Sequence, residues 1–421
     1  MSEHPSKPVW GWAPGDSRPT RCGTFTLKPG VGEFVYAQDY LDSRGPALDP
    51  ISLPTTRRIA PHKEIKQGGV FGVFRDAMPD GFGLFILEAI KERDLPHPLD
   101  RLEHSLGDAV GAIEVCDDIE AKLAYEPPRL DELLDTLKTL PDSRPSSEAA
   151  RMLHHAQGTS LGGERPKMTV LHEGEMWIAK LQDRGDAPNT PLREYAAMRV
   201  GQVLGLDIAD VLFRRAGDRQ VVLVRRFDRT RTSHGFARKL YASAHTVLRL
   251  DGQTREDASR SYVALAKALG RWTYSQGRSS GTNPGAELWR RMAYNAICGN
   301  GDDHPRNHAL LHDGRSWHLA PAFDIAPHAT PSGVLSMSVN RVGDRRPTLG
   351  AILTSHADFS ISKENATAFI DQARDVFAQA WADAVRGVGE NPDDVPCYRW
   401  VPTPGSDGSS QKRETKATPR T

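Results

Sequence analysis

The residues best suited to chemistry lie between Asn300 and Asp324. A polar loop, NGDDHPRN, runs from Asn300 to Asn307, and a further acid, Asp324, follows an apolar stretch. Mg²⁺ prefers oxygen ligands, takes one or two from a protein and fills its shell with water and phosphate. In kinases, a catalytic aspartate stands five residues before a metal-binding asparagine, and a later aspartate also binds metal. This spacing assigns Asp302 as the base and Asn307 and Asp324 as metal ligands.

Two other interpretations of this loop stay open at this point. Asp, Asn, Gly and His are ordinary loop residues, so the D-x-x-x-x-N spacing also arises by chance. A transition metal could instead bind His304, His308 and the pair Asp302 and Asp303, because imidazole and carboxylate are common ligands. The loop alone does not choose among these interpretations.

A helix and a hairpin are predicted to position the loop. Apolar residues recur at helical spacing over 288–297, which predicts a buried helix that leads into the loop. The apolar runs 308–311 and 316–320 are separated by an Asp-Gly pair suited to a tight turn. The resulting hairpin should return Asp324 towards Asn307.

A glycine-rich loop and a strand lysine lie upstream. Gly162 and Gly163 would let backbone amides approach phosphate oxygens because no Cβ intervenes, and Lys167 adds positive charge. The alternating pattern of 168–181 predicts a hairpin that carries Lys180 near its end. A strand lysine beneath a glycine-rich loop pairs with nucleotide phosphates in kinases. Taken alone, a solvated turn and a surface lysine explain these residues better, and neither a P-loop nor a dinucleotide fingerprint is present.

Acidic residues after this hairpin extend the pattern. The predicted helix 191–205 carries Glu194 in its first turn, where it could hold the strand lysine or simply suit the helix dipole. The apolar strand 220–227 then turns polar, and Asp228 could contact a ribose or pair with Arg229. These features follow one another in the order found in a kinase: a glycine-rich loop, a strand lysine, a helix glutamate, a hinge strand, and a loop with an aspartate and an asparagine. The kinase interpretation therefore becomes the favoured one.

Composition and pattern suggest the organisation of the chain. Short β-type runs and a helix preceded by the turn 76–83 predict a small N-terminal αβ lobe over 20–115. The polar, helix-prone segment 116–150 is predicted to be a connector, and 151–390 to be a catalytic domain. The tail 401–421 lacks the apolar content to fold and is predicted to be disordered.

Composition also limits the functional classes. At 421 residues and 38% hydrophobic content the chain can bury two or three cores. Lys and Arg equal Asp and Glu at 54 each, which gives no argument for nucleic acid or a membrane as the main partner. The four cysteines are scattered, which favours a reducing cytoplasm, and no stretch approaches a membrane-spanning apolar run.

Several motifs resemble the HipA family of bacterial toxin kinases. The similarity covers roughly residues 20–385 and includes FRDAMPDGFG at 74–83, which is similar to that family's N-terminal subdomain. It implies an α+β, two-lobed fold of the protein-kinase and phosphoinositide-kinase type, with a small N-terminal αβ subdomain. The other motifs are SLGGERPK at 160–167, WIAKL at 177–181, REYAAMRVGQVLGL at 193–206, RRFDR at 225–229, NGDDHPRNHALL at 300–311 and LAPAFDIAP at 319–327.

The resemblance implies a serine/threonine protein kinase that uses ATP and Mg²⁺. Asp302 would be its base, Asn307 and Asp324 would hold Mg²⁺, and Glu194 and Asp228 would support the site. Ser160 matches an autophosphorylated serine whose modification inactivates the kinase, although the adjacent Thr159 is an alternative. The nucleotide-binding set would comprise Gly162, Gly163, Glu164, Arg165, Pro166 and Lys167 over the phosphates, Lys180, Arg225, Arg226 and Phe227 along the phosphates and adenine, and His304, Asn307, Phe323 and Asp324 from the catalytic loop and hairpin.

The resemblance also implies partners. Members of the family are typically neutralised by a small helix-turn-helix antitoxin of the HipB type that binds operator DNA. Their best-known substrates are aminoacyl-tRNA synthetases, whose phosphorylation halts translation. Two alternatives remain: a small-molecule phosphotransferase, which the N-terminal lobe and Ser160 disfavour, and a non-enzymatic corepressor that acts with a DNA-binding antitoxin.

Overall fold

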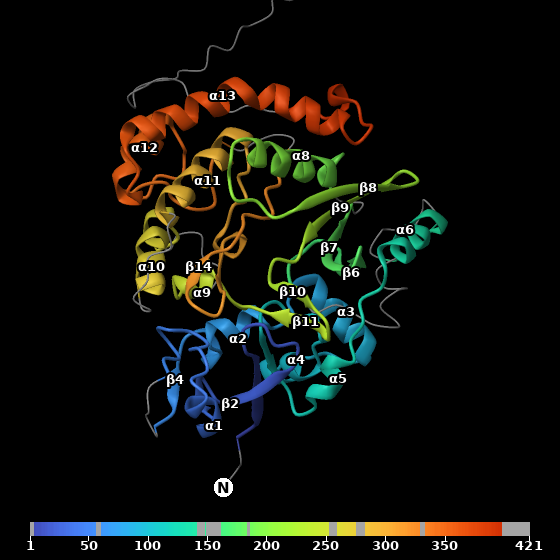
Figure 1. Ribbon diagram of the computed structural model, residues 1–421, viewed down its shortest axis with the longest axis vertical. Helices are drawn as coiled ribbons and strands as arrows, with labels where there is room; N and C mark the ends of the chain where they lie inside the picture. The colour runs from blue at the N-terminus through green and yellow to red at the C-terminus, as the bar shows by residue number, and fades with distance from the viewer. Residues whose placement is uncertain are drawn as a thin grey trace, which may run out of the picture.

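The computed structural model describes residues 4–55, 60–140, 148, 161–182, 186–251, 259–274, 283–328 and 333–397. In Figure 1 the N-terminal subdomain lies at the bottom, and above it a small lobe built on a sheet and a mainly helical lobe lie side by side, with helix α13 across the top. Thr159, Ser160 and the predicted disordered tail 401–421 lie outside the described residues.

The N-terminal subdomain is built on a five-stranded antiparallel sheet in the order β4-β3-β2-β1-β5. Alternation along β2 and β3 buries Phe25 and Phe34, which meet Phe71 and Phe74 at the start of helix α2 with ring centroids 5.0 to 5.9 Å apart. Such aromatic contacts add about 0.5–1.5 kcal/mol each beyond area burial. The elements are β1 (Ser6–Trp12), β2 (Pro19–Lys28), β3 (Val31–Tyr36), α1 (Gln38–Asp42), β4 (His62–Glu64), η1 (Gln67–Gly69), α2 (Gly72–Asp76), α3 (Gly81–Lys91), α4 (Pro98–His104) and β5 (Ile113–Val115).

Two helices occupy the segment that the sequence suggests is a connector. Helix α5 (Ile119–Leu123) joins the N-terminal subdomain, because Lys122 Nζ donates to the carbonyl oxygen of Leu102 at 2.8 Å. Helix α6 (Leu130–Thr139) instead turns its leucines towards the small-lobe sheet. Helices α5 and α6 therefore contribute to two different cores.

The small lobe is a four-stranded antiparallel sheet in the order β6-β7-β9-β8, covered on both faces. Along β9, Val221 and Leu223 pack with the leucines of α6 and with Ile86 of α3, whereas Val222 and Val224 pack with helix α8. This two-sided burial explains why β9 reads as a continuous apolar run. The elements are β6 (Lys167–His172), β7 (Glu175–Leu181), α8 (Thr190–Val203), β8 (Val211–Ala216) and β9 (Arg219–Arg225).

The helical lobe carries the polar loop between a helix and a hairpin, which confirms the prediction from the sequence. Helix α11 precedes the loop, and β13 and β14 follow it as a hairpin in which β13 pairs with both β12 and β14. In the described part of the chain, no helix combines the length and apolar character that crossing a bilayer requires. The elements are β10 (Arg229–Thr232), β11 (Gly235–Arg238), β12 (Leu240–Ser243), α9 (Ala244–Val247), α10 (Tyr262–Tyr274), α11 (Pro284–Cys298), η2 (Pro305–Asn307), β13 (Ala309–His312), β14 (Trp317–Leu319), α12 (Leu349–Thr354), η3 (His356–Phe359), α13 (Lys363–Arg386) and η4 (Pro392–Asp394).

The burial of the cysteines makes a testable difference among them. All four are free thiols; Cys22, Cys116 and Cys298 are buried, and burial raises the pKa of each to about 12, whereas Cys397 is partly exposed. Because the thiolate is the reactive form, the three buried thiols should resist modification at pH 8. Titration with a chromogenic disulfide should release about one equivalent rapidly from the native protein and about four after unfolding. Rapid reaction of a second thiol in the native protein would contradict this burial.

Candidate active site

A lysine held between two carboxylates is the centre of the site. Lys180 Nζ lies 2.5 Å from Glu194 Oε1 and 2.5 Å from Asp324 Oδ1. Trp177, Ala179 and Leu181 of β7 pack towards α6, so strand alternation turns Lys180 to the opposite face, where α8 presents Glu194. The pattern of the sheet thus delivers the ammonium to the glutamate.

The predicted position of Glu194 within its helix needs a small correction. Helix α8 begins at Thr190 after the N-cap Asn189, so Glu194 lies just past the first turn rather than within it. The effect of the helix dipole on an acid is strongest in the first turn, so the dipole does not explain the position of Glu194. Its contact with Lys180 does.

A second lysine adds positive charge to the same face. Lys167 pairs with Lys180 in the antiparallel register of β6 and β7, which places both side chains on one side of the sheet. Like charges directly opposite each other destabilise a sheet. Glu194 and Asp324 compensate for this repulsion, and the four residues form one cluster of two lysines and two acids.

The electrostatics keep Asp324 ionised. Burial by itself would raise the pKa of Asp324, but Lys180 and Lys167 outweigh burial and lower it well below its usual range. Burial would lower the pKa of Lys180, yet Asp324 and Glu194 raise it. Burial raises the pKa of Glu194 and lowers that of Lys167. Asp324, whose side chain is 37% exposed, is therefore an anion that a cation can reach.

The backbone around Asp324 is held from two sides. Asp324 has φ +60°, a left-handed conformation that Asp and Asn tolerate better than most residues. The amide of Ala322 donates to the carbonyl oxygen of Asp207 at 2.7 Å, and Arg291 Nη1 of α11 donates to the carbonyl oxygen of Ala320 at 2.8 Å. These bonds fix the segment that leads into the acid.

The two adjacent aspartates of the polar loop have different surroundings. Asp303 is buried and accepts hydrogen bonds from the Tyr262 hydroxyl, from Asn295 Nδ2 at 2.7 Å and from His308 Nε2 at 2.8 Å. Asp302 is exposed. Asp303 thus anchors the loop to the helical lobe, and of the two aspartates only Asp302 exposes its carboxylate to solvent.

The side chains of the loop fit Mg²⁺ better than a transition metal. In the described part of the chain, no group of three or more His, Cys, Asp or Glu side chains could hold a metal ion, and His308 Nε2 is bonded to Asp303. Mg²⁺ needs only one or two carboxylates from the protein. Asp324 would supply one, and Asn307 would add its amide oxygen, since its Nδ2 donates to the carbonyl oxygen of Asp302 at 3.3 Å.

The glycine-rich loop lies directly above Lys167. Gly163 has φ +100°, a backbone conformation that favours glycine, and a Cβ there would stand 2.5 Å from Lys167 Nζ. Glu164 is exposed, whereas Arg165 Nε lies 3.2 Å from Asp186 Oδ1. The carbonyl oxygen of Pro166 accepts the amide of Leu181 at 3.0 Å, which ties the loop to β7.

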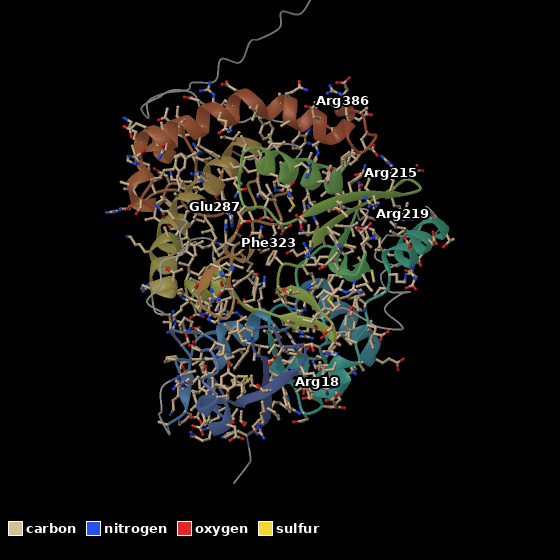
Figure 2. All side chains as sticks on the ribbon, viewed as in Figure 1. Arg18, Arg215, Arg219, Glu287, Phe323 and Arg386 are labelled. Carbon is tan, nitrogen blue, oxygen red and sulfur yellow. The ribbon has the colours of Figure 1, made fainter. Side chains whose placement is uncertain are left out.

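The hinge residues, 225–228 at the end of the predicted hinge strand, divide into two groups. The rings of Phe227 and Phe323 contact each other with centroids 5.3 Å apart, and Figure 2 shows Phe323 near the middle of the molecule. Arg225 pairs with Glu175 and Asp210 at the surface. The structure thus places Phe227 next to the segment that carries Asp324.

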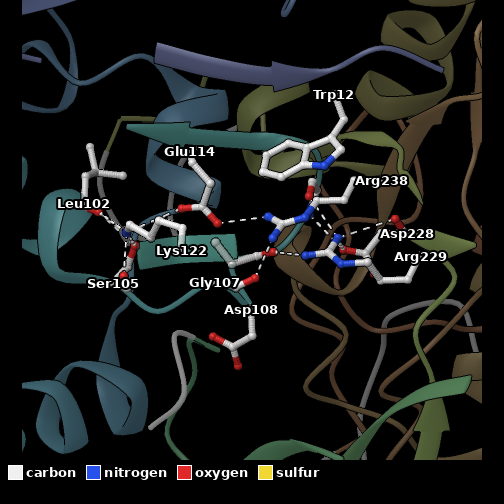
Figure 3. A network of polar contacts seen from close by, with 12 residues as sticks. Trp12, Leu102, Ser105, Gly107, Asp108, Glu114, Lys122, Asp228, Arg229 and Arg238 are labelled. Atoms are coloured by element: carbon white, nitrogen blue, oxygen red, sulfur yellow. Dashed lines mark hydrogen bonds and ion pairs between the residues drawn. The ribbon is translucent and has the colours of Figure 1, made fainter. Parts of the chain in front are cut away.

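Arg226 and Asp228 make buried contacts with residues 108–111, which lie just before β5 of the N-terminal subdomain. Arg226 is buried and donates to the carbonyl oxygens of Asp108 and Ala109. Asp228 pairs with Arg226 and Arg229 at 2.8 Å. Two roles were predicted for Asp228, contact with a ribose and an ion pair with Arg229, and the structure shows the ion pair. Figure 3 shows Asp228 and Arg229 within a buried polar network.

Sequence reasoning missed several contacts of the site. Asp80, in a loop interpreted as a turn, binds both Gly163 of the glycine-rich loop and Arg306 of the polar loop. Asp303 and Tyr262 were not singled out as a pair either. The only signal for Asp80 was its place in an acidic, glycine-rich loop, and nothing local indicated its partners.

Comparison with known families decides the relationship. Residues 159–381 match the family model of the HipA-like C-terminal domain, and residues 17–116 match that of the HipA N-terminal domain. The chain belongs to the HipA family. The resemblance noted in the sequence is thereby confirmed, and the N-terminal sheet and the two lobes are the HipA N-terminal and C-terminal domains.

Individual relatives of this HipA-family chain are distant. HipA of Shewanella oneidensis MR-1, solved as a toxin–antitoxin complex with HipB and operator DNA, has a TM-score of 0.62 and 16% identity and covers 90% of this chain and 91% of that one. This match confirms the two-lobed, kinase-like α+β fold. Y4mE of Sinorhizobium fredii, whose kinase name is provisional, is 22% identical over 340 residues, 74% of this chain and 76% of its own. The kinase CtkA of Helicobacter pylori covers 53% of this chain and 92% of its own, with 13% identity and a TM-score of 0.35.

Proposed function

We propose that this chain is an ATP- and Mg²⁺-dependent serine/threonine protein kinase that acts as a toxin. The observation that carries the proposal is the Lys180 ammonium, 2.5 Å from both Glu194 and Asp324. In protein kinases the lysine–glutamate pair and the metal-binding aspartate must both be in place for activity. Here Lys180, Glu194 and Asp324, the residues proposed for these three roles, form one hydrogen-bonded cluster.

Each residue has a role in this proposal. When bound, ATP would supply the phosphoryl group and Mg²⁺ would neutralise its charge. Lys180 would orient the phosphates, with Glu194 holding its ammonium, and Asn307 and Asp324 would hold the metal. Asp302 would accept the proton of the substrate hydroxyl as the hydroxyl oxygen bonds to the γ-phosphorus of ATP and the bond from that phosphorus to ADP breaks. The exposed position of Asp302 suits a hydroxyl presented by another protein.

The partners of the proposal follow from the relatives. HipA of Shewanella oneidensis is solved with HipB and operator DNA. We expect a HipB-like helix-turn-helix antitoxin that mediates contact with operator DNA, because this chain has no excess of basic residues for binding phosphates itself. The substrate would be a cellular protein, with an aminoacyl-tRNA synthetase as the first candidate, and its phosphorylation would arrest translation and growth.

Self-modification would regulate the same site. Ser160 precedes the described part of the glycine-rich loop, and its phosphorylation would add about −1.5 to −2 charges. A bound nucleotide is also strongly anionic, so the added charge would repel it. The expected result is an inactive phosphoprotein, and Thr159 is the alternative position.

An intact-mass experiment tests the kinase proposal. The wild type, incubated with ATP and Mg²⁺, should gain one phosphate that maps to Ser160. Asp302→Asn should react about 10²- to 10⁴-fold more slowly, because general-base catalysis is worth that much. Asp218→Asn, at an exposed turn between β8 and β9, is the matched control and should behave as the wild type. A wild type that neither gains mass nor binds ATP would overturn the proposal.

A further inference from the structure

One carboxylate of the N-terminal subdomain joins two loops of the candidate active site. Asp80 Oδ1 accepts the backbone N–H of Gly163 at 2.8 Å, and Asp80 Oδ2 accepts Arg306 Nη1 at 2.7 Å. Gly163 belongs to the glycine loop (161–167) and Arg306 to the catalytic loop (300–307). Asp80 is thus the point at which three distant parts of the chain meet.

The carboxylate is directed away from its usual local partner. Asp80 is the N-cap residue of α3, with an extended backbone at φ −136° and ψ 174°. An aspartate at this position normally accepts the amide of the second or third helical residue and stabilises the helix. Here the side chain makes no cap hydrogen bond. Helix α3 therefore lacks a side-chain cap from Asp80, whose carboxylate binds the two loops instead.

The backbones at this junction are too close for side chains. Phe82 N donates to the carbonyl oxygen of Gly163 at 2.8 Å, so the glycine loop is bound through both its donor and its acceptor. A Cβ on Gly81 would stand 2.6 Å from that same oxygen, and a Cβ on Gly162 would stand 2.1 Å from Asp80 Oδ1. The contact between the two segments therefore depends on glycine on both sides.

The junction sets the spacing of the site. Gly163 covers Lys167, which belongs to the lysine cluster, and Arg306 immediately precedes Asn307. Asp80 and Arg306 are each 37% exposed at the side chain, and ion pairs this exposed contribute little to global stability. The contact therefore matters for the positions of the two loops more than for stability. Misplacement of a reacting group by about 1 Å can lower a rate by about 100-fold.

We infer that Asp80 is a positioning residue through which the N-terminal subdomain holds the glycine loop against the catalytic loop. The inference rests on the proposed kinase function and deepens it. The N-terminal subdomain then forms part of the catalytic device, since the spacing between the loop above the phosphates and the loop that bears the base is fixed from outside the kinase-like lobes.

Two measurements on the full chain test the inference. Asp80→Ala removes both hydrogen bonds, Asp80→Asn keeps one acceptor but loses the charge, and Asp94→Asn is the control on an exposed acid of the same subdomain. Hydrogen exchange of the peptide spanning 161–167 should become faster in Asp80→Ala and stay unchanged in the control. This measurement needs no catalysis, so it tests the junction even if the kinase proposal fails.

The kinetic measurement tests the consequence for the site. Asp80→Ala should lower kcat/KM for ATP by about tenfold to 100-fold, Asp80→Asn by less, and the melting temperature should change little. Arg306→Ala combined with Asp80→Ala should lose less than the product of the single losses, because the two residues share one contact. An inactive wild type would count against the kinase proposal. An active wild type with unchanged exchange and kinetics in Asp80→Ala would overturn the inference alone.

Discussion

Asp324→Asn is expected to lower the rate of phosphotransfer by about 100- to 1000-fold, the usual loss when one preorganised electrostatic contact is removed. The carboxylate is the anion of the cluster that is accessible to a cation, and the two lysines keep its pKa well below the usual range. Asparagine has nearly the same shape and also tolerates the φ of +60° at this position. The substitution therefore removes charge while the backbone is expected to stay in place.

The dependence on Mg²⁺ distinguishes a metal ligand from a structural acid. In Asp324→Asn the Mg²⁺ concentration for half-maximal rate should rise, while the pair between Lys180 and Glu194 remains to bind nucleotide phosphates. Titration of the rate with Mg²⁺, alongside ATP binding in its absence, measures the two effects separately. Asp218→Asn again serves as the control. Wild-type activity and an unchanged Mg²⁺ requirement in Asp324→Asn would remove this residue from the proposed metal site.

Local pattern was enough to predict the elements around the loop. The stripe at 288–297 predicted α11, and the paired apolar runs predicted β13 and β14. The contact of Lys180 with Glu194 was one of two roles considered for this acid, and the structure shows it: strand alternation selects one face of β7, and the next helix covers that face. The periodicity of apolar residues can thus predict contacts within one helix or strand and between elements that are neighbours in the sequence.

The remaining contacts could not be predicted because they join segments far apart in the chain. Asp80 meets a residue 83 positions away and another 226 positions away. Helix α6 shows the same limit, since its leucine stripe predicts a buried face without indicating which surface covers it. With 54 acidic and 54 basic residues, no local rule selects the partners of one carboxylate. The tertiary fold alone makes that selection.

A buried network at the hinge also joins segments that are far apart in the chain. Asp228 accepts the amide of Gly111 at 2.8 Å, Arg226 Nη2 at 2.8 Å and Arg229 Nη1 at 2.8 Å. Arg238 extends the network to Glu114 at 2.9 Å and lies 3.8 Å from the centre of the Trp12 ring (Figure 3). The network therefore joins the hinge after β9 to the N-terminal subdomain.

Asp228→Asn is expected to destabilise the protein by about 3–5 kcal/mol, because it leaves two guanidinium groups buried without their counter-charge. The side chains of Arg226, Asp228 and Arg229 are only 1%, 4% and 2% exposed. The midpoint of chemical denaturation, followed for the full chain, measures the loss. Asp210→Asn is the matched control: Asp210 lies 3.1 Å from Arg225 but both side chains are exposed, so the loss should be about 0–1 kcal/mol.

The pH dependence of this loss follows from the sign of the pKa shift. Burial would raise the pKa of Asp228, but Arg226 and Arg229 outweigh burial and hold it well below the usual range. A group whose pKa is lowered by folding contributes its stability above its unfolded pKa and loses it as the pH falls towards the folded pKa. The difference between the wild type and Asp228→Asn should therefore be constant from about pH 5 to 8 and narrow below about pH 4. A difference as small as that of Asp210→Asn, or one that already narrows near pH 6, would mean that this carboxylate does not hold the hinge through its charge.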